Sequence, residues 1–194
     1  MYFPATFARL LLAAAASLIA AFTFGARPAE AARADRCPGS LDIPSSPAAA
    51  NQAADAIVCL VNAERTSRGL KALQRDGDLA QAARKHAADM VRRNYFGHVS
   101  PSGKSPGDRV REAGYAHPGD DWKVGEDLGW GTGSRATPNT LVDEWLASPP
   151  HRRIMLEPGF RELGVGVAPG APLDHLTSLP GATYALDLAV IQNA

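Results

Sequence analysis

The order of the hydrophobic patterns along the chain restricts its fold more than any other feature. Apolar residues recur at helical spacing in the earlier part, whereas two strand patterns come late, at 163–168 and 182–191. In the second stretch, Tyr184, Leu186 and Leu188 alternate with smaller or polar residues. Early helices followed by late strands predict an α+β domain with a small, mostly antiparallel sheet. A chain of 194 residues is long enough for one such domain with a sizeable core.

The remaining elements are predicted from apolar spacing and from residues that start helices. Asp78, Ser105 and Thr137 are typical N-cap residues, and Pro106 and Pro138 suit the first helical turn. Together these signals predict helices at 51–68, 78–93, 106–113 and 138–147, a single helical turn at 151–156, and an extended segment at 124–130.

The N-terminus has the three parts of a signal peptide. Arg9 provides the positive charge, residues 10–24 form a short apolar run, and Ala-Glu-Ala at 29–31 is a small-residue cleavage site. The alternative is an uncleaved membrane anchor, for which this run is short. We therefore expect residues 1–31 to be a signal peptide. The product would be secreted, extracellular or periplasmic, with no transmembrane anchor after cleavage.

Export makes one disulfide the simplest state of the two cysteines, Cys37 and Cys59. A pair of thiolate metal ligands is the alternative, but the two residues lack the C-x-x-C spacing. The bridge would tie an irregular arm at 32–50, rich in Ala, Pro and Ser, to the first helix of a domain spanning 51–194. Closing a loop of about twenty residues contributes roughly 3 kcal/mol in the chain-entropy model.

The charge balance excludes several classes of partner. Twenty basic residues balance twenty acidic ones, so the sequence gives no reason to expect nucleic acid, an anionic membrane surface or a highly charged substrate as the main partner. A hydrophobic content of 45% with 21% charged residues is typical of a globular protein.

Three short stretches each combine an ionisable side chain with glycine or proline. His98 lies in FGHVSPSG, Glu126 in VGEDLGWG and His151 in EWLASPPHRRIML. Two imidazoles and a carboxylate suit a zinc ion that keeps an open water position. A hydrogen-bonded polar cluster that only holds loops together needs the same residue types. The sequence has no H-E-x-x-H helix, so it lacks the usual support for a metalloprotease.

The same stretches, preceded by LVNAERTSRGLKAL and followed by FRELGVGVA, resemble the bacterial branch of the CAP superfamily, also called SCP-like extracellular proteins. This superfamily includes cysteine-rich secretory proteins, antigen-five venom allergens and plant pathogenesis-related proteins. The resemblance covers residues 55–191 and implies a three-layer α-β-α sandwich with a cleft. It also implies that a His-Glu-Glu-His tetrad lines this cleft and can hold a divalent cation such as zinc in some members.

Three members of that tetrad have counterparts here, namely His98, Glu126 and His151. In the eukaryotic branch, the other Glu follows a Trp by three residues, and that place is taken here by Ser148. Glu144, one turn earlier, could project from a similar face, but we expect it to be a solvated helix residue.

Three further ionisable residues stand out in the sequence. Asp127 stands where the family usually has Asn, which adds a charge next to Glu126. His86 lies on an apolar helical face and is expected to be a core residue. Arg109 can pair with a carboxylate across the loop, but the sequence does not identify one.

These observations predict a secreted protein that binds a ligand in a cleft centred on His98, Glu126 and His151. The ligand would be a divalent cation such as zinc, a lipid-like molecule or a cell-envelope component. Two alternatives are a secreted hydrolase that uses a metal-bound or His-activated water, and a structural or interaction module of the cell envelope. Binding without catalysis is favoured, since neither Ser100 nor Ser148 lies in a G-x-S-x-G nucleophile elbow.

Overall fold

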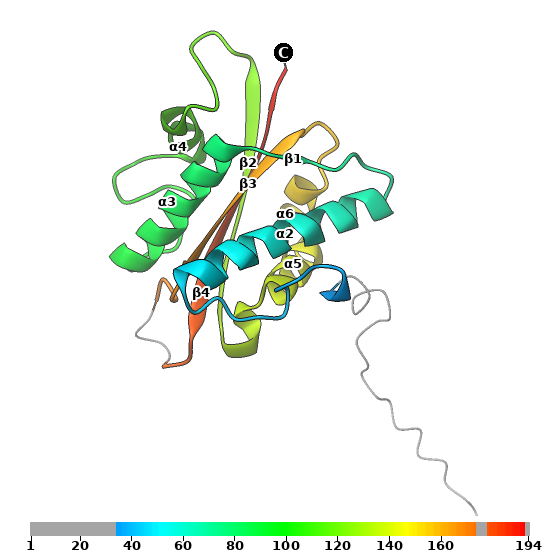
Figure 1. Cartoon of the computed structure of the whole chain (residues 1–194). Helices are drawn as coiled ribbons and strands as arrows, with labels where there is room; N and C mark the ends of the chain where they lie inside the picture. The colour runs from blue at the N-terminus through cyan, green and yellow to red at the C-terminus, as the bar shows by residue number, and fades with distance from the viewer. Residues whose placement is uncertain (1–33, 174–177, 193–194) are drawn as a thin grey trace, which may run out of the picture.

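The computed structural model describes residues 34–173 and 178–192, and Figure 1 shows the arrangement of their elements. Five helices with assigned bounds and a four-stranded sheet make up the described part. The helices are α2 (Pro47–Ser67), α3 (Gly77–Arg93), α4 (Pro106–Ala113), α5 (Pro138–Ala147) and α6 (Pro149–Met155), with a short 3-10 turn η1 (Gly133–Ala136). The strands are β1 (Gln74–Arg75), β2 (Trp122–Thr132), β3 (Glu162–Pro169) and β4 (Gly181–Ile191).

The sheet has the strand order β1-β3-β4-β2 and lies between two helical layers. β4 pairs antiparallel with both β2 and β3, whereas the two-residue β1 runs parallel to β3. Helices α3 and α4 lie on one face, and α2, α5 and α6 on the other (Figure 1). The α+β prediction with a small, mostly antiparallel sheet is therefore confirmed.

The larger core lies between the sheet and the layer of α2 and α5. Trp145 and Tyr184 are its largest fully buried aromatic residues, and both also make hydrogen bonds. The indole of Trp145 donates to the carbonyl of Leu128 at 2.9 Å, and the Tyr184 hydroxyl donates to the carbonyl of Ala136 at 2.6 Å. Burial of these rings therefore leaves no polar atom of theirs unpaired, as a buried Trp or Tyr requires.

Helix α3 packs unusually close to β3 because two glycines face it. A Cβ atom at Gly164 would lie 2.0 Å from the backbone nitrogen of Ala80, and one at Gly166 would lie 2.1 Å from the carbonyl carbon of Ala83. Any side chain at these positions would push the helix away from the sheet. This contact fixes the helix whose C-terminal end leads into the loop that carries His98.

The termini of several helices differ from those predicted. Helix α2 begins at Pro47 because Ser46 caps it, rather than at residue 51. The carboxylate of Asp76 caps α3 by accepting from the backbone nitrogens of Asp78 and Leu79, so Asp78 is not the cap. Pro149 starts α6, since a proline in the first turn lacks only a donor that would be unpaired anyway.

Cys37 and Cys59 form the predicted disulfide, with their Cα atoms 5.7 Å apart. The bridge joins the segment before α2 to the middle of that helix. The predicted signal peptide, residues 1–31, lies outside the described residues. Within 34–173 and 178–192, no helix combines the length and the apolar character needed to cross a bilayer.

Candidate functional site

The loop that follows α3 places His98 against a buried carboxylate of β2. It begins at Asn94, whose left-handed backbone (φ 52°) ends the helix. Nδ1 of His98 lies 2.7 Å from Oε1 of Glu126, whose side chain is 1% exposed, whereas that of His98 is 52% exposed. A carboxylate can only accept, so Nδ1 carries the proton of this bond. Whenever the ring is neutral, its Nε2 atom therefore keeps its lone pair.

The guanidinium of Arg109 joins this pair to the loop backbone. Its Nη2 donates to Oε2 of Glu126 at 2.6 Å, while Nη1 donates to the carbonyl oxygens of His98 at 2.9 Å and Lys104 at 3.0 Å. Arg109 is buried, so this is a buried ion pair in which His98 and Arg109 each engage one oxygen of the carboxylate. One residue of α4 thus fixes both Glu126 and the loop that presents His98.

A second carboxyl group lies beside Glu126 on the neighbouring strand. Asp187 of β4 is the register partner of Glu126, and the adjacent positions Ala185 and Ala189 pack against α3, which places Asp187 on the same face. Burial, and then the negative charge of Glu126, raise the pKa of Asp187 well above its usual value, while Arg109 opposes this. The neutral form of Asp187 is therefore favoured beside Glu126 and Arg109.

His86 of α3 completes the cluster from the helix side. Its Nε2 lies 3.0 Å from the carbonyl oxygen of Gly97 and 4.0 Å from Oε2 of Glu126. Because a carbonyl oxygen only accepts, Nε2 donates in this bond, and burial lowers the pKa of the ring. The Tyr95 hydroxyl, 3.4 Å from Nδ1, donates to Asp89 at 2.9 Å. The expected core histidine is buried, and it also holds the backbone next to His98.

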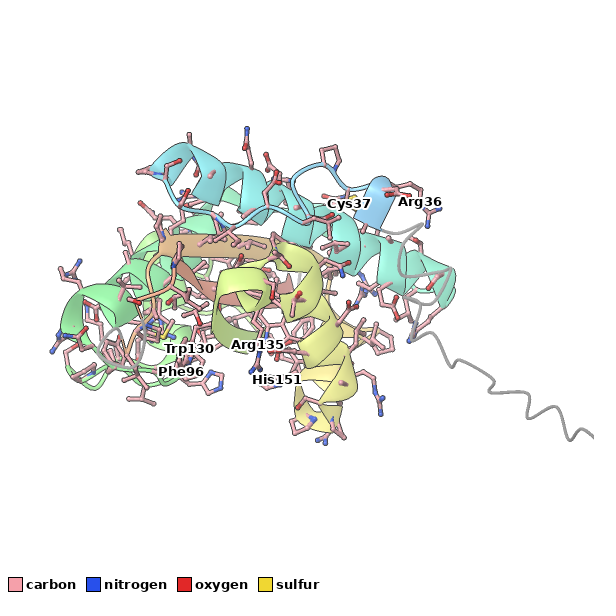
Figure 2. The ribbon with its side chains drawn as sticks, turned by 90° about the horizontal axis from the view of Figure 1, so that it is seen from below. Arg36, Cys37, Phe96, Trp130, Arg135 and His151 are labelled. Carbon is pink, nitrogen blue, oxygen red and sulfur yellow. A yellow bond between two sulfur atoms is a disulfide. The ribbon has the colours of Figure 1, made fainter. Side chains whose placement is uncertain are left out.

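His151 approaches from a different element, helix α6, and is partly exposed. In Figure 2 it is labelled on the same side of the molecule as Phe96 and Trp130, opposite Cys37. Burial lowers the pKa of His151, and the charge of His98 lowers it further. The second effect means that the two rings lie within electrostatic range. The structure therefore brings His98 into contact with Glu126, and places His151 near His98 without a hydrogen bond between them in the described part of the chain.

The donor set fits a cation only in part. Across the described residues, no three His, Cys, Asp or Glu side chains are grouped as a metal ion would need. Both oxygens of Glu126 are engaged, and Arg109 places a positive charge beside the carboxylate. What this arrangement offers is the free Nε2 of His98, with Glu126 as the outer partner that sets its tautomer. A cation here would therefore rely on imidazole nitrogen rather than on the carboxylate.

Asp127, the residue after Glu126, points to the opposite face of the sheet. Its neighbours on that face are Gly125 and Gly129, which lie against side chains of α6 and α5. Asp127 is fully buried, and neither carboxyl oxygen has a hydrogen-bond partner among the described residues. Burial, and then the charge of Glu126, raise its pKa to about 8. Asp127 is consequently protonated at pH 7, so it does not strengthen attraction for a cation.

Two residues outside the predicted set belong to the site, and one candidate does not. Arg109 and Asp187 contact or oppose Glu126, although no local pattern in the sequence joins them. The polar position of Asp187 within an apolar strand was the only signal for it. Glu144 is solvent-accessible and pairs with Arg135 at 2.9 Å, as expected of a solvated helix residue.

The sequence has clear relatives among known proteins. The sequence model of the cysteine-rich secretory protein (CAP) family matches residues 58–179. The uncharacterized protein YkwD of Bacillus subtilis is 37% identical over 122 residues, which are 63% of this chain and 45% of that protein. The uncharacterized membrane protein YlbC of the same organism is 35% identical over 111 residues, which are 57% and 30% of the two chains. The chain therefore spans less than half the length of these curated relatives.

Solved structures resemble the fold. A Bacillus anthracis extracellular protein containing an SCP domain has a TM-score of 0.58 at 26% identity, covering 75% of this chain and 44% of that one. An outer surface protein of Borrelia burgdorferi has a TM-score of 0.57 at 17% identity, covering 70% and 90%. The second likeness is one of fold alone.

Proposed function

The chain belongs to the cysteine-rich secretory protein (CAP) family, and we propose that it is an exported protein that binds a ligand between His98 and His151. One observation carries this proposal. The 2.7 Å bond from His98 Nδ1 to buried Glu126 holds a half-exposed imidazole whose second nitrogen has no partner among the described residues. A ring oriented in this way can accept a proton, donate one or bind a cation without rearranging.

The energetic design of the cluster supports binding rather than simple packing. Burying a carboxylate costs several kcal/mol unless its charge and its lone pairs are matched. Arg109 and His98 supply that match for Glu126, and Arg109 also holds two loop carbonyls. A purely structural cluster would gain by burying His98 as well. Instead, the one exposed member of the network is the imidazole that would meet a ligand.

Divalent cations, zinc first among them, are the ligand class that two neighbouring imidazoles favour. In this proposal, His98 and His151 provide the nitrogen donors, and Glu126 orients His98 from behind instead of binding the ion. The lowered pKa of His151 helps, because a metal needs the neutral ring. A lipid-like molecule or a cell-envelope component that hydrogen-bonds to the same rings is the other ligand class consistent with the site.

A secreted hydrolase is the second candidate, and the His98–Glu126 contact is what favours it. A carboxylate bound to one imidazole nitrogen leaves the other to act as a general base toward water. Ser100 does not complete such a site as a nucleophile, because its hydroxyl pairs with Ser102 at 2.9 Å and with the backbone nitrogen of Lys104 at 3.1 Å. In this candidate the nucleophile would be a water activated by His98.

Export is part of the proposal. It is supported by the signal-peptide pattern of residues 1–31 and by the Cys37–Cys59 disulfide, a bond that persists in oxidising compartments. Cell fractionation with detection of the N-terminus of the mature chain tests it. Material retained in the cytoplasm with residues 1–31 intact would contradict it.

Zinc titration of the purified chain by isothermal calorimetry tests the cation form of the proposal. We expect one equivalent to bind, with affinity falling at least about tenfold in His98→Ala and in His151→Ala. His117→Ala is the matched control, because this histidine is exposed in the loop after α4 and should leave the affinity unchanged. Equal zinc uptake by the wild type and all three variants, or no uptake by the wild type, would contradict it.

A substrate panel separates the hydrolase candidate from binding alone. Peptide, ester and glycan substrates would be incubated with the wild type and with His98→Ala, with and without a chelator. Turnover that disappears in His98→Ala would establish the hydrolase. Flat traces for every substrate would remove it and leave the binding role.

A further inference from the structure

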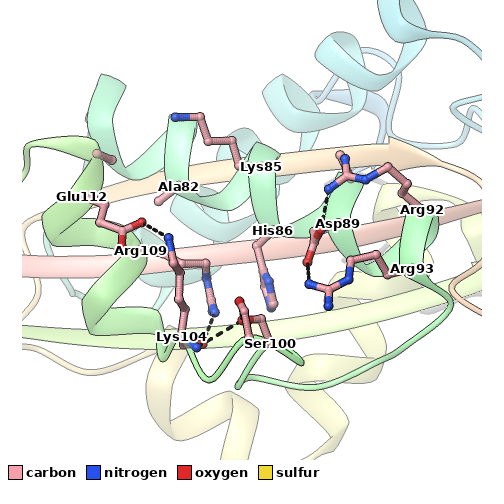
Figure 3. A pocket seen from close by; sticks show the side chains of 13 residues that line it. Ala82, Lys85, His86, Asp89, Arg92, Arg93, Ser100, Lys104, Arg109 and Glu112 are labelled. Carbon is pink, nitrogen blue, oxygen red and sulfur yellow. Dashed lines mark hydrogen bonds and ion pairs between the residues drawn. The ribbon is translucent and has the colours of Figure 1, made fainter.

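A second hollow lies behind the His86–Arg109 wall of the site, between α3 and α4. Its volume is about 420 Å³, within the range of pockets that hold small organic ligands. Figure 3 shows the helix α3 side chains above it and the 100–104 loop below. His86 and Arg109 line it from within, so both residues separate it from Glu126.

The lining of this hollow is strongly basic. Five cationic side chains face it, against two acidic ones, Asp89 and Glu112. This local excess of positive charge contrasts with the zero net charge of the chain. Two serine hydroxyls, those of Ser100 and Ser102, add neutral hydrogen-bonding groups at the floor. A concave basic surface of this kind raises the local concentration of anions.

The cationic groups of α3 keep positive charge that the protein does not match. Lys85 has no acidic partner among the residues that the structure describes, whereas Lys104 pairs with Glu112 at 2.7 Å. Arg92 and Arg93 share a single carboxylate, that of Asp89, so two positive charges face one negative charge there. The α3 side of the hollow therefore has an excess of positive charge, which an anionic ligand would match.

We propose that this hollow binds the phosphate group of a small soluble molecule. Lys85, Arg92 and Arg93 would engage the phosphate oxygens, while Ala82 and Ala113 provide small apolar contacts for the rest of the ligand. A phosphate carries close to two negative charges at pH 7, which matches the excess positive charge of the lining. Arginine also matches phosphate geometry through its planar fork of donors.

This site is distinct from the His98–His151 site, although Arg109 touches both. The guanidinium of Arg109 is already used by Glu126 and the loop, and the phosphate would be bound by the cationic side chains of α3 instead. Phosphate binding therefore does not require Glu126 to be released. The bound phosphate would add a negative charge behind His86 and Arg109. It would also hold the 100–104 loop, which continues the segment that carries His98.

Calorimetric titration of the purified full chain with glycerol 3-phosphate, in low salt, is the direct test. We expect one saturable site whose affinity falls about tenfold or more in Lys85→Glu and further in Lys85→Glu/Arg92→Glu, and which weakens as salt is added. Lys71→Glu is the matched control, since it makes the same charge change at an exposed lysine outside the lining. His98→Ala should keep its phosphate affinity, which separates this test from that of the proposed function.

Two further arms locate and identify the ligand. The ring signals of His86, followed by NMR, should shift on phosphate addition, because this buried ring lines the hollow. Inorganic phosphate should bind at the same place with lower affinity. The inference is overturned if Lys71→Glu weakens binding as much as Lys85→Glu, or if the His86 signals stay fixed at saturation. Binding only to phosphatidylglycerol vesicles, with no response to the soluble phosphates, would also overturn it.

Discussion

Glu126 and Asp127 are consecutive residues of β2, both buried, and the sheet sends them to opposite faces. On the α3–α4 face, Glu126 meets Arg109, His98 and His86, so its charge is matched and its oxygens are engaged. On the α5–α6 face, Asp127 lies between Gly125 and Gly129, which pack against helix side chains, and it has no hydrogen-bond partner in the described part of the chain. The same chemical group thus has charged and polar partners on one face and none among the described residues on the other.

The contrast shows that partners, rather than burial, decide the charge of a carboxyl group. A buried acid without partners takes up a proton, which is why the pKa of Asp127 rises to about 8. A buried acid with a guanidinium and an imidazole can keep its charge and use it to orient them. Glu126, with its partners, is therefore where binding chemistry is available, whereas burial of Asp127 bears a cost.

The largest loss of stability is expected from removing Arg109, which provides the counter-charge of Glu126. Arg109→Met would leave Glu126 buried without its counter-charge, and the variant should lose about 3–5 kcal/mol of unfolding free energy, measured by urea denaturation at pH 7. Arg135→Met is the control, because it breaks an exposed pair with Glu144 and should cost less than about 1 kcal/mol. Similar losses of unfolding free energy in both variants would contradict the stabilising role assigned to the partners of Glu126.

The next effect has the opposite sign and concerns Asp127. Its folded pKa of about 8 lies above its usual value of 3.8, so the folded state binds the proton more tightly. The stability from this group is complete below about pH 4 and is lost as the pH rises toward 8. Asp127→Asn removes this loss and should stabilise the protein by roughly 2–4 kcal/mol at pH 7, with a smaller gain at pH 5.

Denaturation curves at pH 4, 5, 6, 7 and 8 would check that slope. Asp55→Asn serves as the control, since its carboxylate is 65% exposed and pairs only with Arg75 on the surface. It should change stability by less than about 1 kcal/mol at pH 7. If Asp127→Asn left the pH dependence as it is in the wild type, Asp127 would have an unseen partner and the contrast with Glu126 would fail.

The smallest effect on stability is expected from removing His98, the exposed partner of Glu126. His98→Ala removes a ring that is 52% exposed but leaves one buried oxygen of Glu126 unpaired, so we expect a loss of about 1–2 kcal/mol, together with the weaker zinc binding described above. Thermal unfolding of the variant checks the first part. A loss as large as that in Arg109→Met would mean that His98 serves the fold, which favours the structural module over a binding protein.

The sequence predicted the helices and strands whose bounds depend on neighbouring residues. Ser105 and Asp108 form a capping box, Gly114 ends α4 with a positive φ, and that helix has the predicted bounds. The two-residue strand β1 was not predicted, because it exists only through its pairing with β3. The extended segment around Glu126 is longer than predicted, since β4 pairs with its whole length.

The sequence predicted those site residues that lie within recognisable motifs. His98 and Glu126 were chosen from their stretches and are in contact. The pairing of Arg109 with Glu126 was not identified, because it depends on how α4 packs on the sheet. Asp187 was missed for a similar reason, since only the β2–β4 register places it opposite Glu126. Pairing between distant segments is set by packing, which no short stretch of sequence encodes.

The central claim is that His98, held by Glu126, shares its surroundings with His151. The most direct test is an NMR titration of the His151 ring in the wild type and in His98→Ala. Because the charge of His98 lowers the pKa of His151, the account predicts that this pKa rises in the variant. An unchanged His151 titration in a folded His98→Ala would contradict it, since the two rings would then lie too far apart to meet one ligand.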